Sequence, residues 1–144
     1  MSSPVKFLPC CLLFLMMAVP AAHAETLKVR IVGLKDSAGQ VEVMVWKDAA
    51  GFPTDARTTV ARKRVRVSGQ VAEVTIGTLP RGVYAVAAYQ DLNGNGEMDR
   101  SIFGWPVEPV GASRGARGRM GPPRFQDAAF ELKEPVQEIE IKVK

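Results

Sequence analysis

Short stretches of alternating apolar and polar residues, separated by turn-forming residues, limit the folds open to this chain more than any other feature. A period of two residues is typical of a β-strand with one buried face, and no window shows the 3.6-residue apolar stripe of an amphipathic helix. The alternating stretches lie at 27–32, 41–46, 63–67, 71–76 and 136–143. With two further apolar runs they give about seven strands, so we expect an all-β fold, a single antiparallel two-sheet β-sandwich with one long irregular loop.

The order of these strands gives two finer expectations. Turn-forming residues separate the first two stretches, so 27–32 and 41–46 are expected to form a β-hairpin with one buried face. The run at 83–89 is mostly apolar, as in a central strand that is covered on both faces. The residues from 91 to about 124 contain no such pattern and form the irregular part of the chain.

The N-terminal segment has the composition of a secretory signal peptide. Lys6 supplies the positive start, an apolar run follows at 7–19, and an A-x-A cleavage site lies at 22–24. The apolar run is shorter than the roughly 18 residues that suggest a membrane span. We therefore expect residues 1–24 to be removed, which leaves one domain at 25–144, exported to the periplasm or to the outside of the cell without a membrane span.

Removal of this segment changes the chemistry that the protein can use. Cys10, Cys11 and the single histidine, His23, all lie within it. The mature chain would then contain no disulfide, no histidine-based zinc site and no Ser-His-Asp triad. The net charge of the whole chain is a mild +4 at pH 7, and no aromatic residues are interleaved with the basic ones, so we expect no nucleic-acid partner.

The stretch at 91–99 is the part of the chain whose spacing calls for a specific chemistry. Its side-chain oxygens stand at positions 1, 3, 5 and 9 of a D-x-[DN]-x-[DN]-G calcium loop, and Gly96 stands at position 6, where the chain must turn sharply. The backbone carbonyl of Glu97 would serve at position 7. Ca²⁺ takes six to eight oxygen ligands. The expected side-chain ligands are Asp91, Asn93, Asn95 and Asp99.

This calcium loop is incomplete at position 12, where such loops carry a bidentate Glu and this chain carries Ile102. The missing ligand could come from Glu108, which is the next carboxylate, from a distant loop or from water. The affinity is therefore expected to be weak, with a Kd on the order of 10⁻⁴–10⁻³ M. The alternative is a polar turn that needs no ion, because Asn-Gly pairs form turns by themselves.

The long irregular segment also carries candidate partner-binding residues. Trp105 lies close to the calcium-like turn, and Arg114, Arg117 and Arg119 follow among glycines with no acidic residue between them. These arginines suggest binding to an anionic envelope polymer such as lipopolysaccharide. The alternatives are a solvated basic loop and, for Trp105, a hydrophobic plug that ties the loop to the sandwich.

Several of these motifs together resemble the DUF2141 family of exported bacterial proteins. The family pattern LP-x-G-x-YA, D-x-NxNGxxD, G-φ-PxE and GPPxFxDAxF is similar to the stretches at 79–85, 91–99, 104–108 and 121–130. The resemblance covers most of the mature chain. It implies an immunoglobulin- or prealbumin-like sandwich and no known reaction.

The chain departs from the family pattern in two places. Gln90 stands where the family usually has a His before the Asp, and residues 111–114 replace a GFSN-like segment. Glu108, in contrast, matches the family's acidic residue after the Pro. This match favours a role for Glu108 in completing the metal site or in hydrogen bonding to the loop.

We therefore expect an exported, non-enzymatic β-sandwich protein whose turn at 91–99 binds Ca²⁺ and orders a long loop for contact with an envelope partner, an anionic polymer or a protein. One alternative is an enzyme that uses clustered carboxylates on a glycan. The other is a structural module whose turn binds no metal.

Overall fold

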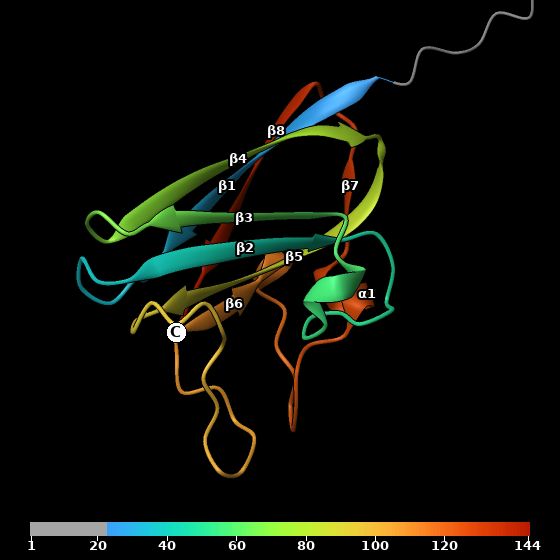
Figure 1. The fold of residues 1–144 in the computed structure, drawn as a ribbon. Coiled ribbons are helices and arrows are strands. Elements are labelled where there is room, and N and C mark those ends of the chain that lie inside the picture. The colour runs from blue at the N-terminus through green and yellow to red at the C-terminus, as the bar shows by residue number, and fades with distance from the viewer. Residues whose placement is uncertain (1–22) are drawn as a thin grey trace, which may run out of the picture.

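The computed structural model describes residues 23–144, which form a sandwich of two β-sheets (Figure 1). This confirms the two-sheet β-sandwich. The described residues form eight strands rather than about seven. The predicted signal peptide lies, apart from its last two residues, outside the described residues.

The first sheet has three strands in the order β4-β1-β8. These are β4 (Val71–Pro80), β1 (Ala24–Val32) and β8 (Val136–Lys142). The β1–β4 pair is antiparallel, as expected, whereas β1 and β8 run parallel. Alternation along a strand reports its buried face and not the direction of its neighbour, so the sequence pattern did not reveal the parallel pair.

The second sheet has the order β3-β2-β5-β6, with a further strand, β7, paired to β5. Its strands are β3 (Ala61–Arg66), β2 (Gln40–Trp46), β5 (Gly82–Asp91), β6 (Val110–Ala112) and β7 (Phe130–Leu132). All of its pairs are antiparallel. β5 is central, as its apolar composition predicted, because β2 lies along one side and β6 and β7 along the other.

Three short helical turns connect the strands. They are η1 (Ala56–Thr58), η2 (Ser113–Gly115) and α1 (Phe125–Ala128). The stretch expected to be irregular from 91 to about 124 is therefore interrupted by β6 and η2. Within residues 23–144, no helix is long and apolar enough to cross a membrane.

The expected hairpin between the first two strands is wrong, because β1 and β2 belong to different sheets. The intervening residues cross from one layer of the sandwich to the other instead of reversing within a sheet. Each strand does bury one face against the opposite sheet, so the period of two was read correctly. What the pattern lacked was any information about the partner of each strand.

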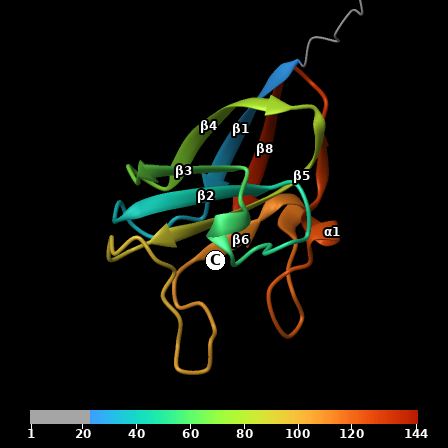
Figure 2. The same cartoon turned by 45° about the vertical axis from the view of Figure 1, so that its right-hand side comes forward.

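The second sheet is also covered on its outer face. Met44 and Trp46 on β2 and Ala87 and Tyr89 on β5 form a buried cluster there, separate from the core between the sheets. The ring of Phe52 packs edge-on against Trp46 at 5.2 Å. β2 is thus buried on both faces, not on one. The loops that follow β2, β5 and β6 provide the cover, and they include the candidate site (Figures 1 and 2).

Candidate functional site

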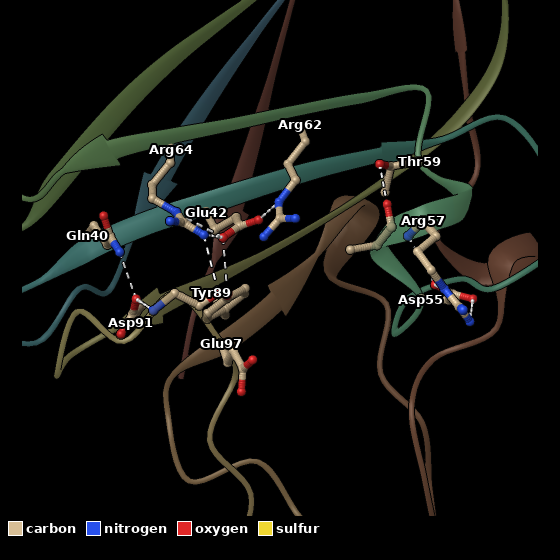
Figure 3. A network of polar contacts seen from close by, with 12 residues as sticks. Gln40, Glu42, Asp55, Arg57, Thr59, Arg62, Arg64, Tyr89, Asp91 and Glu97 are labelled. Atoms are coloured by element: carbon tan, nitrogen blue, oxygen red, sulfur yellow. Dashed lines mark hydrogen bonds and ion pairs between the residues drawn. The ribbon is translucent and has the colours of Figure 1, made fainter.

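Asp91, at the end of β5, organises the turn at 91–99. Its side chain is fully buried, and its Oδ1 accepts a hydrogen bond from the backbone N–H of Gly94 at 2.7 Å. Its Oδ2 accepts from the backbone N–H of Gly96 at 2.8 Å and from Nε2 of Gln40 at 2.8 Å (Figure 3). Burial by itself would raise the pKa of Asp91, but the hydrogen bonds from Gln40, Gly96, Gly94 and Asn95 together lower it, so the carboxylate is held in its charged form.

The rest of the turn is closed by asparagine side chains. Oδ1 of Asn93 accepts from the backbone N–H of Asn95, and Oδ1 of Asn95 accepts from that of Glu97, each at 3.0 Å. Gly96 has a φ of 82°, so the expected left-handed turn at this position is confirmed. Glu97 itself is exposed, and its side chain lies apart from Asp91 (Figure 3).

Asp99 faces the same two asparagines from the far side of the turn. Its Oδ1 accepts from Nδ2 of Asn95 at 2.9 Å, and its Oδ2 accepts from Nδ2 of Asn93. The amide groups therefore direct their oxygens to the backbone and their nitrogens to Asp99. A cation at this position would have to replace these nitrogen contacts with oxygen contacts.

Glu108 ties the two ends of the turn together from outside it. Its side chain is buried, its Oε1 accepts from the backbone N–H of Leu92 at 2.8 Å, and its Oε2 accepts from that of Asp99 at 3.1 Å. Of the two roles considered for Glu108, the structure shows the hydrogen bonds to the loop. Ile102, at position 12, is 94% exposed and apolar.

The oxygen atoms of the turn are of the kinds that a hard cation prefers, but few of them carry a negative charge. Carboxylate, amide and backbone oxygens are the ligands that Ca²⁺ prefers, and the turn brings all three kinds close together. However, residues 23–144 contain no group of three or more His, Cys, Asp or Glu side chains placed to hold a metal. Binding would therefore rely on the asparagines and on a backbone carbonyl, which favours low affinity.

A charge network around one buried carboxylate, which the sequence did not predict, contacts the turn. Glu42 on β2 is fully buried; it pairs with Arg62 and, at 2.5 Å, with Nη2 of Arg64, both on the edge strand β3 (Figure 3). Tyr89 donates its hydroxyl to Glu42 at 3.1 Å, and Arg64 also donates to the carbonyl of Gly96 at 3.2 Å. Met44 and Trp46 lie on the same face of β2 as Glu42. Their apolar character was the sequence signal available to show that this face is covered.

The two loops that follow β5 and β6 enclose a groove of about 610 Å³ on the outer face of the second sheet. Trp105 from the first loop and Arg117 from the second lie in its lining, so the structure brings these two predicted contact residues together. Apolar side chains such as Met44, Met98 and Val110 form much of its surface. The groove was not predicted, because its walls come from segments that are far apart in the sequence.

The other two arginines lie elsewhere. Arg119 lines an adjoining hollow together with Arg117 and Arg124. Arg114 is exposed and donates from Nη1 to the carbonyl of Ala129 at 3.1 Å, on the side of α1.

The two departures from the family pattern each have a structural role. Gln90 is fully buried; its Oε1 accepts from the backbone N–H of Lys35, and its Nε2 donates to the carbonyls of Lys35 and Ala38. Ser113 is buried as well; its Oγ accepts from the N–H of Val86 at 3.0 Å and donates to the carbonyl of Ala128 at 2.6 Å. Both residues fasten connecting segments to the second sheet.

Comparison with known families agrees with the motifs around this turn. The family described as "Uncharacterized protein conserved in bacteria (DUF2141)" matches residues 29–140, which is most of the chain. The chain belongs to the DUF2141 family. The matched range includes the turn, Glu108 and both loops of the groove. Searches of the curated proteins and of the solved structures found no match.

Proposed function

We propose that this DUF2141 protein is an exported, non-enzymatic binding protein of the bacterial cell envelope. In this proposal the turn at 91–99 binds Ca²⁺ and thereby orders the loop at 92–109 for contact with an envelope partner. The observation that carries the proposal is the position of Glu108. It joins the two ends of the turn, and Trp105, three residues before it, lies in the groove with Arg117.

Calcium has a definite role in this arrangement. The turn gathers the carboxylates of Asp91 and Asp99 next to two asparagine amides, and several of the hydrogen bonds that maintain its shape are exposed to solvent. A divalent cation would neutralise the carboxylates and replace several of these bonds with ion–oxygen contacts. The loop would then be anchored at its base, as binding loops commonly are on rigid scaffolds.

The groove supplies the contact surface. Its volume lies in the range of small-ligand sites, and it combines mainly apolar walls with a few polar groups. Trp105 is 54% exposed, so part of its ring remains available to a partner. The groove thus offers aromatic and cationic contacts of the kind that suit an anionic envelope component.

One observation favours a second candidate, a structural module whose turn needs no ion. Both oxygens of Asp91 and both oxygens of Asp99 already accept hydrogen bonds from within the turn or from Gln40. In that case the loop would be equally ordered without calcium. The two candidates differ in one measurable property, the effect of Ca²⁺ on stability.

Thermal unfolding of the purified protein in chelator and in about 10 mM Ca²⁺ separates them. With a Kd of about 10⁻⁴–10⁻³ M, the ion should raise the free energy of unfolding by about 1.4–2.7 kcal/mol, which is a rise of several degrees in Tm for a domain of this size. A parallel titration with Mg²⁺ tests the selectivity of the site.

Asp99→Asn is the matched variant, because it keeps the shape of the side chain and removes one ligand charge. Asp36→Asn, on the exposed surface, is the control. The proposal predicts that Asp99→Asn abolishes the calcium-dependent rise and that Asp36→Asn keeps it. Equal Tm values in chelator and in Ca²⁺ for the unmodified protein would favour the metal-free module.

A further inference from the structure

We propose that the envelope partner is the surface of an anionic phospholipid bilayer, on which the tips of the loops at 92–109 and 116–124 dock. The inference rests on the proposed function in one respect, because it uses the same loops as the contact surface. It does not require calcium.

Among the residues that the structure describes, the tips of these two loops carry the most exposed large apolar side chains. Ile102 and Phe103 on the first loop are 94% and 81% exposed, and Met120 on the second is 93% exposed. Elsewhere in residues 23–144 the large exposed apolar residues are single valines, at most 54% exposed. Such a cluster marks an interaction site, because transfer of these side chains from water to an apolar environment lowers the free energy.

The two tips are placed to reach one surface at the same time. Both loops leave the β5–β6 side of the second sheet and extend in the same direction away from the sandwich (Figures 1 and 2). Phe103 and Met120 both line the groove between the loops, so they belong to one continuous apolar region. A bilayer could receive both tips without any movement of the sandwich.

The charges around this region complement an anionic surface. The described lining of the groove includes the cationic side chains of Arg100, Arg117 and Lys142 and no Asp or Glu side chain. Arg119 also lines the adjoining hollow, where the one carboxylate, Asp127, is paired with Arg124. Within residues 23–144 neither Arg117 nor Arg119 forms an ion pair. The carboxylates of the first loop lie at its base, in the turn and at Glu108, away from its tip.

This combination favours a lipid surface over a soluble polymer. A charged polysaccharide would account for the arginines but would leave Ile102, Phe103 and Met120 in water. At a bilayer the apolar tips enter the acyl boundary, Trp105 lies at the level of the headgroups, and the arginines contact the phosphates. The exposed apolar side chains, Trp105 and the arginines of the two loops would then each contact the part of the bilayer that matches their polarity.

Trp105 provides a direct reporter of docking. The only other tryptophan, Trp46, is fully buried and contacts Phe52. A change in fluorescence on addition of vesicles therefore arises from Trp105. Insertion predicts a shift of its emission to shorter wavelength and protection from an aqueous quencher.

The test is co-sedimentation and tryptophan fluorescence of the full protein with vesicles of phosphatidylcholine alone and vesicles that also contain phosphatidylglycerol. Binding is expected only with the anionic vesicles and is expected to weaken with added salt. Phe103→Ser with Met120→Ser should lower the partition coefficient roughly tenfold or more. Arg117→Gln and Arg119→Gln should each lower it about fivefold.

The control is Val83→Ser with Val136→Ser, which removes two exposed apolar side chains from other parts of the surface. This variant should bind within about twofold of the unmodified protein. Failure of the unmodified protein to bind anionic vesicles, in chelator and in Ca²⁺ alike, would overturn the inference. So would binding that the Phe103/Met120 variant retains in full, since the apolar tips would then have no role.

Measurement in both chelator and Ca²⁺ separates this inference from the calcium proposal. Equal binding in the two conditions, together with no effect of Ca²⁺ on Tm, would support the lipid surface and contradict the calcium turn. A calcium-dependent rise in Tm without vesicle binding would support the calcium turn and contradict the lipid surface. A soluble anionic polysaccharide, tested as a competitor, should displace the protein from vesicles only weakly; complete displacement with no effect of the Phe103/Met120 substitutions would identify a polymer site and overturn the inference.

Discussion

Glu108 accepts a hydrogen bond from the backbone N–H of Asp99 at 3.1 Å, although nine residues separate them along the chain. Its other oxygen holds the N–H of Leu92 at 2.8 Å, so one buried carboxylate closes the loop on both sides. The residue that sequence spacing suggested as a substitute metal ligand thus acts on the backbone of the turn. These two hydrogen bonds fix the ends of the segment that carries the proposed ion site and the exposed Phe103 and Trp105.

Glu108→Gln tests the two hydrogen bonds that the Glu108 carboxylate accepts from the backbone. The amide has only one acceptor oxygen, so its nitrogen would face one of the two backbone N–H groups and leave it without a partner. We expect the free energy of unfolding to fall by about 1.5–3 kcal/mol, measured by urea denaturation in chelator. Glu134→Gln, on the exposed surface, should change it by less than about 0.5 kcal/mol; similar small effects from both substitutions would contradict the role of Glu108.

Glu42→Ala tests the network beneath the turn. It removes the buried partner of Arg62, Arg64 and the hydroxyl of Tyr89. We expect a loss of about 1–3 kcal/mol, because the buried hydroxyl and two half-exposed guanidinium groups lose a charged acceptor. The matched control is Glu140→Ala. The Glu140 side chain is 61% exposed, and its Oε2 lies 3.8 Å from Nε of Arg30. An exposed pair of this kind should contribute less than about 1 kcal/mol. Equal losses in chemical denaturation would show that burial of Glu42 does not matter.

Asp91 gives the stability a defined dependence on pH. Since the pKa of its carboxyl is lowered in the folded protein, from 3.8, the charged form stabilises the fold above about pH 4, and this contribution is lost as the pH falls through the folded-state pKa. Asp91→Asn cannot titrate. The difference in the free energy of unfolding between the two proteins should therefore be largest near pH 6 and should shrink below about pH 4. A constant difference from pH 6 to pH 2.5 would exclude this coupling.

Ser113→Ala tests the attachment of the second loop. The hydroxyl bridges the N–H of Val86 on β5 and the carbonyl of Ala128 on α1, so its loss leaves two buried backbone groups without a partner. We expect a cost of about 1–3 kcal/mol, together with faster amide exchange at 116–124. Ser68→Ala, at an exposed position, is the control, and an equally small effect of both would contradict a structural role for Ser113.

The sequence was sufficient to predict the two layers of the sandwich but not which strands are neighbours within each sheet. Residues 27–32 and 71–76 alternate because each strand has one face in the core, and this regularity is sufficient to predict a sandwich. Strand partners depend on long-range register, which leaves no local trace, so β1 and β2 were wrongly paired. The same reason explains why the parallel β1–β8 pair went unseen.

The candidate site was predictable in its local part only. The spacing from Asp91 to Asp99 marks a turn because its ligand and glycine positions are close in sequence. Glu42 could not be recognised as buried, because its partners, Arg62 and Arg64 on β3 and Tyr89 on β5, lie about twenty to fifty residues later in the chain. Likewise, the groove exists only because Trp105 and Arg117 come from two loops that fold against the same sheet.

Amide hydrogen exchange of residues 92–109, followed in chelator and in millimolar Ca²⁺, tests most directly the claim that the ion orders this loop. We expect Ca²⁺ to slow exchange from the turn through Trp105, and we expect Asp99→Asn to remove the effect while Asp36→Asn retains it. Exchange at the same rate in both conditions would contradict calcium-dependent ordering, and the loop would then depend on its own hydrogen bonds, including those of Asp91, Asp99 and Glu108.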